Sequence, residues 1–257
     1  MDIKIPYTPR KHQAYLHKKI SENRWNVLVC HRRFGKTVCM INHLIRSALL
    51  SKNKNPRYAY IAPTFKQAKS IAWDYMKQFT AKIPYTKFNE TELRVDLPNG
   101  SRITLLGSEN SDGLRGIYLD GCVIDEYANV NERLFPEIIR PALSDRKGYC
   151  VFIGTPQGMN NNFYELYQHA QGADDWFNYK AKASDTKIVD NEELVKAKEV
   201  MGEKKYLQEF ECDWIANIEG AVYSDVLVKM EDKKQLTRVP YDPSLPVSRG
   251  LMAFLSL

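Results

Sequence analysis

The residues best placed to do chemistry lie between Cys30 and Thr37. This segment reads Cys-His-Arg-Arg-Phe-Gly-Lys-Thr and follows an apolar run over 25–29. Where a loop ends in Gly-Lys-Thr and opens a helix, backbone N–H groups hold phosphate, the lysine reaches the β- and γ-phosphates, and the hydroxyl binds Mg²⁺. Lys36 and Thr37 are therefore predicted to bind the phosphates and the metal of a nucleotide. Because Cys30 stands where the usual pattern has glycine, the loop alone does not separate a nucleotide site from a chance match.

Two adjacent carboxylates follow another apolar run. Gly121 to Ile124 is typical of a buried parallel strand, and Asp125 and Glu126 come directly after it. Ligands bind at the carboxyl ends of strands in open α/β sheets. Asp125 is predicted to hold Mg²⁺, and Glu126 to orient and deprotonate the attacking water. An Asp-Glu pair also begins ordinary turns, so this interpretation depends on the loop upstream.

Two further motifs complete the set. The apolar run 151–153 ends in Gly-Thr-Pro, where Thr155 is placed to sense the γ-phosphate or its water. Glycines flank Arg115, which suits an arginine finger aimed at the phosphate of a neighbouring subunit. A solvated loop arginine fits Arg115 equally well, and Arg32 and Arg33 are competing candidates that would act within their own subunit.

Strands alternating with helices must position these residues. Apolar runs predict strands, and apolar residues at helical spacing predict helices. The predicted strands cover 25–29, 58–62, 121–124 and 149–153, and the predicted helices cover a segment ending at 22, 37–50, a segment from 64, 131–143 with a break at Pro141, 162–171 and 191–210. Asn99-Gly100 between the runs 91–97 and 101–106 predicts a hairpin. This order indicates an α/β fold with a largely parallel sheet flanked by helices, followed by a small helical subdomain.

Composition sets wider bounds. The 257 residues suit one large domain, with or without a small appendage, and a net charge of +6 permits contact with nucleic acid without requiring it. The five cysteines have no CxxC spacing, which favours reduced, buried side chains in a cytosolic protein. The sequence has no apolar run long enough for a membrane span and no signal-peptide core at its start.

The motifs occur in one order along the chain, joined by Gln13 ahead of the first strand and by the run Ala62-Pro63-Thr64-Phe65-Lys66-Gln67-Ala68-Lys69. In this order they resemble the ATPase domain of tailed-phage terminase large subunits, the motor that packages DNA into a procapsid. The resemblance covers about residues 5–215. In that family the first loop position tolerates residues other than glycine, and arginines inside the loop are usual, so Cys30 is no objection.

The resemblance implies a RecA-like P-loop NTPase fold and a role for each motif residue. Arg32 or Arg33 would touch the γ-phosphate, Arg115 would reach into the next subunit of a ring, and Thr155 would couple hydrolysis to movement. Gln13 would contact adenine. The residues implied to bind the nucleotide are Gln13, Arg32, Arg33, Phe34, Gly35, Lys36 and Thr37.

The resemblance also implies cofactors, partners and a division into domains. ATP and Mg²⁺ would be the cofactors. Double-stranded DNA, the portal protein of the procapsid and the small terminase subunit would be the partners, with a homo-oligomeric ring on the portal and a monomer in isolation. The chain would act in the host cytoplasm, transiently docked on the procapsid and without a membrane. Residues 1–160 would form the ATPase core, 161–218 a helical lid, and 219–257 a linker or tail toward a missing nuclease domain.

The last segment departs from the full family pattern. The acidic residues after Gly220 are Asp225, Glu231, Asp232 and Asp242, which do not form the clustered carboxylates of a two-metal nuclease. DNA cleavage by this chain is therefore expected to be absent. The basic residues considered for DNA contact are Lys66, Lys69, Lys77, Lys82, Lys87, Arg94 and Arg102. Each also fits a solvated surface.

Two other functions stay open on the sequence. A helicase-like ATPase would need a second RecA-like domain, for which 257 residues leave no room. An inactive nucleotide-binding remnant of a prophage is the alternative from a different class. An ATPase assay with and without double-stranded DNA would separate the three.

Overall fold

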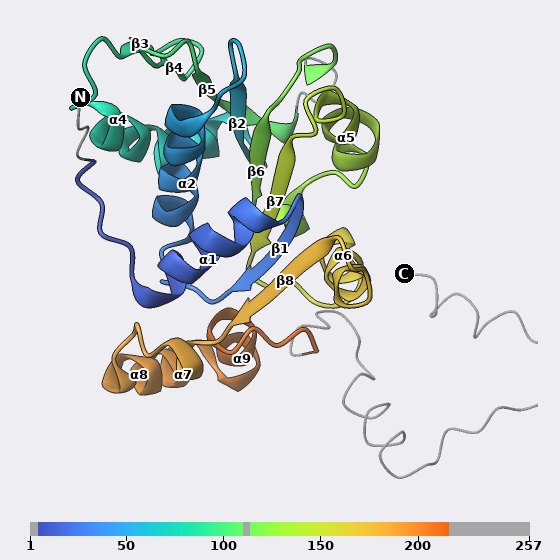
Figure 1. Cartoon of the computed structure of the whole chain (residues 1–257). Helices are drawn as coiled ribbons and strands as arrows, with labels where there is room; N and C mark the ends of the chain where they lie inside the picture. The colour runs from blue at the N-terminus through green and yellow to red at the C-terminus, as the bar shows by residue number, and fades with distance from the viewer. Residues whose placement is uncertain (1–4, 110–113, 216–257) are drawn as a thin grey trace, which may run out of the picture. The chain divides into compact units, whose positions relative to one another are not determined.

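A computed structural model describes residues 5–109 and 114–215 (Figure 1). The chain divides into two compact units, Met1–Asn217 and Ile218–Leu257. The predicted tail over 219–257 lies outside the described residues, as do Asp112 and Gly113 of the Arg115 loop.

The described residues form an eight-stranded sheet in the order β3-β4-β5-β2-β6-β7-β1-β8. The strands are β1 (Trp25–Cys30), β2 (Arg57–Ala62), β3 (Lys87–Asn89), β4 (Arg94–Asp96), β5 (Arg102–Gly107), β6 (Gly121–Asp125), β7 (Tyr149–Gly154) and β8 (Trp176–Ala181). β5, β2, β6, β7, β1 and β8 are parallel, while β3 and β4 add an antiparallel edge. The carboxyl ends of β6, β7 and β1 therefore lie side by side.

Helical segments connect the strands. They are α1 (Lys11–Glu22), α2 (Lys36–Leu50), α3 (Phe65–Gln67), the π-helix η1 (Ala68–Trp73), α4 (Asp74–Thr80), the 3₁₀ turn η3 (Tyr127–Asn129), the π-helix η4 (Leu134–Ile139), α5 (Arg140–Ala142), α6 (Asn162–Gln171), α7 (Ala183–Thr186), α8 (Asn191–Met201) and α9 (Glu203–Phe210). Figure 1 shows helices on both sides of the sheet.

Two apolar layers cover the two faces of the sheet. Side chains alternate between faces along a strand, so Val123 of β6 packs with α1, α2 and α4, whereas Ile124 packs with η4, α5 and α6. The central strands β1 and β6 are buried along their whole length, which explains their continuous apolar sequences.

Most of the predicted elements are confirmed, including the α/β fold and the hairpin, which is the antiparallel pair β4–β5. The predicted break at Pro141 is a change from the π-helix η4 to α5. The predicted helix over 191–210 is interrupted at Gly202, whose φ of +78° suits glycine.

The segment predicted as a helical lid, 161–218, also contains a strand at 176–181. These residues form β8, which pairs in parallel with β1 at the edge of the sheet. Five of the six residues of β8 are half-buried, because an edge strand keeps contact with solvent. Its sequence therefore mixes aromatic and polar residues and lacks the apolar run that identified the central strands.

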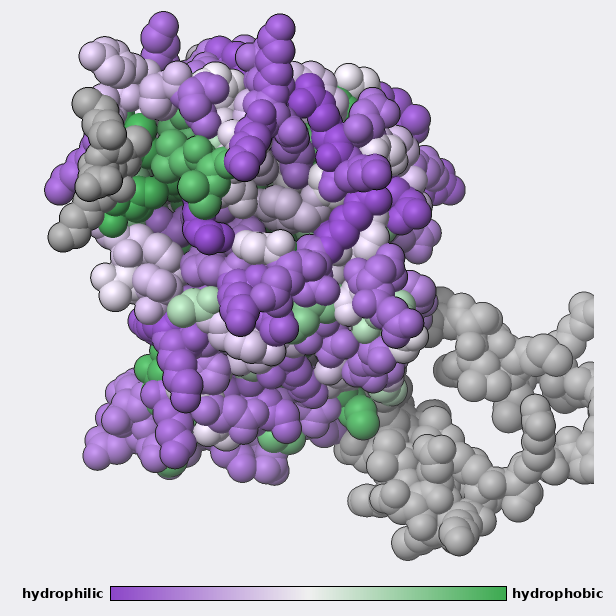
Figure 2. Space-filling view, viewed as in Figure 1, coloured by the Kyte–Doolittle hydropathy of each residue, from purple (hydrophilic) through white to green (hydrophobic). Residues whose placement is uncertain are grey.

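The surface of the described residues is mostly hydrophilic in the view of Figure 2, with an apolar patch at the upper left. In the part of the chain that the structure describes, every helix is too short or too polar to cross a membrane. All five cysteines are buried and free, as predicted.

Candidate active site

The loop between β1 and α2 has the conformation of a phosphate-binding loop. Gly35 precedes α2 with a φ of +86°, and a Cβ at this position would lie 2.9 Å from the Gln13 Nε2 atom. The positive φ favours glycine here, and a Cβ would also require the Gln13 amide to move. Arg33 also has a positive φ of 70°. The Phe34 ring is buried against the His31 ring, so Phe34 can offer a nucleotide its backbone but not its side chain.

Lys36 joins the ends of three neighbouring strands. Its Nζ lies 2.8 Å from Thr155 Oγ1, 3.4 Å from the carbonyl oxygen of Cys30 and 3.6 Å from Glu126 Oε1. The register explains this meeting, because Val29 is level with Gly154 and Asp125 is level with Ile153. The structure thus brings together the lysine, threonine and glutamate that the sequence placed after three separate strands.

The two adjacent carboxylates serve one site because the chain turns between them. Asp125 shares the face of β6 on which α2 lies, and successive residues of a strand point to opposite faces. Glu126 escapes this alternation by adopting the left-handed conformation, with φ 46° and ψ 49°. A non-glycine residue in this conformation stores strain, which is frequent at functional sites.

Burial shapes the acidity of both carboxyl groups. Burial raises the pKa of Asp125, although the Tyr60 hydroxyl and the Lys36 charge oppose it. Burial likewise raises the pKa of Glu126, against the Lys36 charge. A raised pKa makes Glu126 a stronger base than a solvated glutamate, as deprotonating a water requires.

Tyr60 is a site residue that the sequence analysis missed. It lies on β2, next to β6, its hydroxyl donates to Asp125 Oδ2, and Thr37 is among the residues that influence the pKa of that hydroxyl. Tyr60 therefore lies beside both residues predicted to hold Mg²⁺. The sequence could have indicated Tyr60, because a tyrosine inside a buried strand needs a hydrogen-bond partner for its hydroxyl.

These residues fit the metal they were predicted to hold. Mg²⁺ is usually bound through one or two protein oxygens together with phosphates and waters. Asp125 supplies a buried carboxylate and Thr37 a hydroxyl, and Tyr60 lies beside both. Bound there, the ion would neutralise phosphate charge.

Gln13 lies against the phosphate loop from α1. Its side chain is 3 % exposed, and its Nε2 donates to the Gly35 carbonyl oxygen at 3.3 Å. Its Oε1 accepts from the backbone N–H of Arg10 at 3.0 Å, and Arg10 Nη1 is 3.4 Å from the Phe34 carbonyl oxygen. Both side chains therefore contact backbone carbonyl groups of the loop, and Gln13 lies beside the loop at the start of α2.

The candidate arginines have different surroundings. Arg32 and Arg33 are both exposed, and Arg32 Nη1 lies 3.8 Å from Glu209 Oε2 of α9. Arg115 is 58 % exposed at its side chain, and its Nη2 lies 3.7 Å from Glu137 Oε2 of η4. The Arg33 side chain could therefore contact a γ-phosphate directly, whereas the Arg32 side chain would first have to leave Glu209.

Two residues of α9 contact the loops of the site, and the sequence analysis did not predict them individually. Gln208 Nε2 donates to the Pro156 carbonyl oxygen at 2.6 Å. The Glu209 carbonyl oxygen accepts from the Arg32 backbone N–H at 2.7 Å. These contacts join residues far apart in sequence, so no local sequence pattern predicts them.

Among the DNA-contact candidates, three have carboxylate partners. Lys77 pairs with Asp74 and Glu90, while Arg94 and Arg102 both pair with Asp96. The candidates described as exposed are Lys66, Lys69, Lys82 and Lys87.

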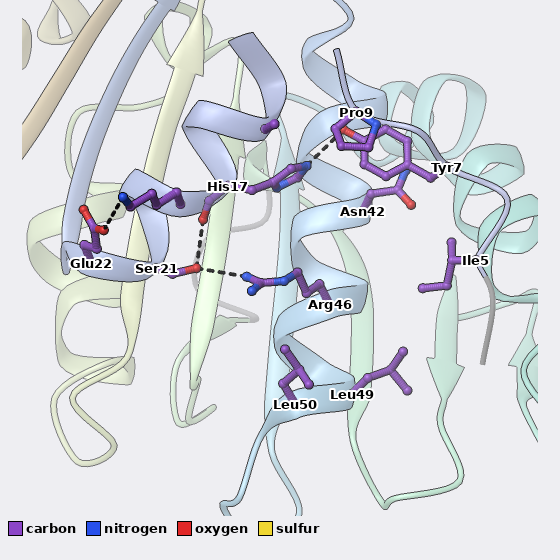
Figure 3. Close-up of a pocket in the computed structure, with 12 residues that line it drawn as sticks. Ile5, Tyr7, Pro9, His17, Ser21, Glu22, Asn42, Arg46, Leu49 and Leu50 are labelled. Carbon is purple, nitrogen blue, oxygen red and sulfur yellow. Dashed lines mark hydrogen bonds and ion pairs between the residues drawn. The ribbon is translucent and has the colours of Figure 1, made fainter. Parts of the chain in front are cut away.

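A groove of about 640 Å³ lies apart from the phosphate loop, between α1, α2 and the segment before α1 (Figure 3). His17 projects into it, with its Nε2 2.9 Å from the Tyr7 hydroxyl and its Nδ1 3.1 Å from His43 Nδ1. The two imidazole rings stack with their centroids 5.4 Å apart. Burial lowers the pKa of His17 to about 4 and that of His43 to about 3, so both rings are neutral at pH 7.

Comparison with known proteins agrees with this geometry. A large terminase subunit of Thermus phage G20c is 26 % identical over 182 residues, which cover 63 % of this chain and 36 % of that protein. A terminase of Thermus virus P23-45 matches to the same extent. The chain thus spans about a third of the length of the curated relatives it matches.

Solved structures have the same fold. The large terminase ATPase domain of Thermus phage P74-26 superposes with a TM-score of 0.69 at 21 % identity, covering 82 % of this chain and 96 % of that one. The large terminase of a thermophilic bacteriophage, in complex with ADP, gives a TM-score of 0.68 at 16 % identity, covering 80 % and 53 %. The family profile of the T4likevirus-type terminase large subunit, N-terminal part, matches residues 29–225, more than half of the chain. The chain therefore belongs to the family of phage terminase large subunits and carries its N-terminal domain.

Proposed function

We propose that this chain is an ATP-hydrolysing motor domain that moves double-stranded viral DNA into a procapsid. The observation that carries the proposal is the meeting of Lys36 with Thr155 and Glu126 at the ends of three adjacent strands. This arrangement supplies a cation for the β- and γ-phosphates, a polar sensor beside it, and a buried base. Membership of the terminase large-subunit family supports the same activity.

In the proposed reaction, MgATP binds across the phosphate loop. Backbone N–H groups at the start of α2 hold the phosphates, and Lys36 neutralises their charge. Asp125 and Thr37 would hold Mg²⁺, and Glu126 would take a proton from the water that attacks the γ-phosphorus as its bond to ADP breaks. The large terminase of a thermophilic bacteriophage, which shares this fold, is known in complex with ADP and with ATP-gamma-S, and this supports nucleotide binding by the chain.

The partners and the moving part belong to the same proposal. The helical segment from Ala183 to Phe210 would act as the lid, since α9 contacts both the phosphate loop and the end of β7. Arg115 would complete the site of the next subunit in a ring on the portal. DNA would be gripped by its phosphates, which carry no base information.

The test measures ATP turnover by the purified chain with and without double-stranded DNA. Glu126→Gln should lower kcat by at least about 100-fold while ATP still binds, because it removes the base. Lys36→Ala should abolish both turnover and tight binding, because it removes the phosphate's charge partner. Glu165→Gln, at an exposed glutamate of α6, is the matched control and should behave as wild type.

Each outcome separates the candidate functions. Stimulation by duplex DNA favours the packaging motor, whereas zero turnover by wild-type protein favours an inactive remnant. Near-normal ATP turnover by Glu126→Gln or Lys36→Ala would contradict the proposed roles of these residues in the active site.

A further inference from the structure

The side chain of Gln208 is buried between α9 and the end of β7. It is 1 % exposed, and its Nε2 donates to the Pro156 carbonyl oxygen at 2.6 Å. Its Oε1 accepts from Lys205 Nζ at 3.2 Å. Both ends of the amide are therefore paired, as a buried amide requires.

The turn that Gln208 holds also carries the threonine of the site. Pro156 has no backbone N–H, so its carbonyl group is the hydrogen-bonding group its backbone can offer. One residue earlier, the Thr155 hydroxyl lies 2.8 Å from Lys36 Nζ, which in turn lies 3.6 Å from Glu126 Oε1. A shift of the Pro156 carbonyl group would therefore move Thr155, and with it the contact that holds Lys36 near Glu126.

The residue beside Gln208 fixes the same helix to the phosphate loop. The Glu209 carbonyl oxygen accepts from the Arg32 N–H at 2.7 Å, and the Glu209 carboxylate lies 3.8 Å from the Arg32 guanidinium. Two consecutive residues of α9 thus contact both loops that surround the candidate phosphate site. Gln208 is the buried one of the pair, and its hydrogen bond is shielded from competing water.

We propose that Gln208 is a positioning residue: through the Pro156 carbonyl it orients Thr155, and through Thr155 it fixes Glu126 relative to Lys36. Its kinetic consequence rests on the proposed function, because it presumes that Glu126 and Lys36 act on ATP. Its structural consequence does not. Removing the donor should loosen the Thr155 turn whether or not the chain hydrolyses ATP.

The first test measures amide hydrogen exchange of Thr155 by NMR. Gln208→Met keeps the length and volume of the side chain and removes the donor. It should speed exchange of the Thr155 N–H about tenfold, since a buried polar group left unpaired loses of the order of one hydrogen bond. Gln168→Met makes the same change at an exposed position of α6 and should leave Thr155 unchanged.

The second test measures steady-state kinetics of the same proteins. Gln208→Met should lower kcat about tenfold and leave the KM for ATP within about twofold, because positioning acts on the chemical step rather than on binding. Gln168→Met should match wild type. Because a loss of folded protein would also lower the apparent kcat at unchanged KM, kcat is expressed per mole of folded protein.

Gln208→Glu guards against a variant that fails to fold. It keeps the side chain's size and the acceptor for Lys205, but its carboxylate has no donor for Pro156. If either variant folds and Thr155 exchange matches wild type, the positioning role is wrong. If both variants unfold the chain, Gln208 serves stability and the inference also falls. A wild-type chain without turnover, but with faster Thr155 exchange in Gln208→Met, would remove the proposed function and leave this inference standing.

Discussion

Asp125 and Glu126 are neighbours in sequence that would point to opposite faces of a regular strand. The left-handed backbone at Glu126 removes that conflict, and both carboxylates reach the side of the sheet on which α2 begins. Their separate proposed roles are consistent with their separate partners. Asp125 is held by the Tyr60 hydroxyl, whereas Glu126 lies beside Lys36 and the Thr155 backbone.

Tyr60 gives a prediction at the residue scale. Tyr60→Phe keeps the buried ring and removes the hydroxyl that donates to Asp125. The concentration of Mg²⁺ needed for half-maximal ATP turnover should rise about tenfold, because partners of a metal ligand tune its affinity by that order. Turnover at saturating Mg²⁺ should fall less.

A matched control lies two residues earlier on the same face of β2. Tyr58 donates its hydroxyl to the Ser47 carbonyl oxygen at 3.2 Å, away from the carboxylates. Tyr58→Phe should leave the Mg²⁺ dependence unchanged. An equal change in both variants would show that the effect comes from the strand and not from the link to Asp125.

At the scale of elements, the packing of α1 on α2 depends on two neutral histidines. His17 and His43 have pKa values of about 4 and about 3, below the ordinary value of 6.5, because both rings are buried. The unfolded chain therefore binds more protons than the folded chain below pH 6.5. Their contribution to stability is complete above pH 6.5 and is lost as the pH falls from there toward 4.

This predicts a specific pH dependence of the free energy of unfolding. Between pH 7 and pH 5, the wild-type chain should lose about 4 kcal/mol more than the double variant His17→Gln, His43→Gln, about 2 kcal/mol for each histidine. Urea titrations at several pH values measure the difference. His169→Gln, at an exposed histidine of α6, should keep the wild-type slope. Equal slopes for the wild-type chain and the double variant would contradict the buried, neutral state.

At the scale of the whole molecule, the open question is what completes the site. Arg115 is exposed and paired with Glu137, on a loop whose residues 110–113 lie outside the described part of the chain. In the proposed ring, Arg115 would reach the site of a neighbouring subunit. A finger acting on a neighbouring subunit would make hydrolysis depend on that assembly.

A mixing experiment tests this dependence. Arg115→Ala should lower turnover by at least about 100-fold, as the loss of an arginine finger does. Adding Glu126→Gln protein should restore part of the activity, because one subunit supplies the base and the other the arginine. A mixture of Lys36→Ala with Glu126→Gln is the control and should stay inactive. No rescue in an assembled mixture would place Arg115 in its own subunit's site or outside any site.

The sequence by itself determined the order of strands and helices, the loop at Lys36 and the carboxylates at Asp125 and Glu126. These features are local, since each follows from a run of apolar residues and the residue types at its end. The edge strand β8 was not predicted, because it is half-buried and its sequence mixes aromatic and polar residues.

Only the tertiary structure decided which residues support the site. The hydroxyl of Tyr60 and the amide of Gln208 reach it from β2 and α9, respectively 65 and 52 residues away in sequence from the partners they bond. Contacts of this kind depend on strand order and helix packing, which no single segment encodes. Whether Arg32 pairs with Glu209 or with a phosphate is likewise set by the packing of α9 against the loop, and not by the loop's own sequence.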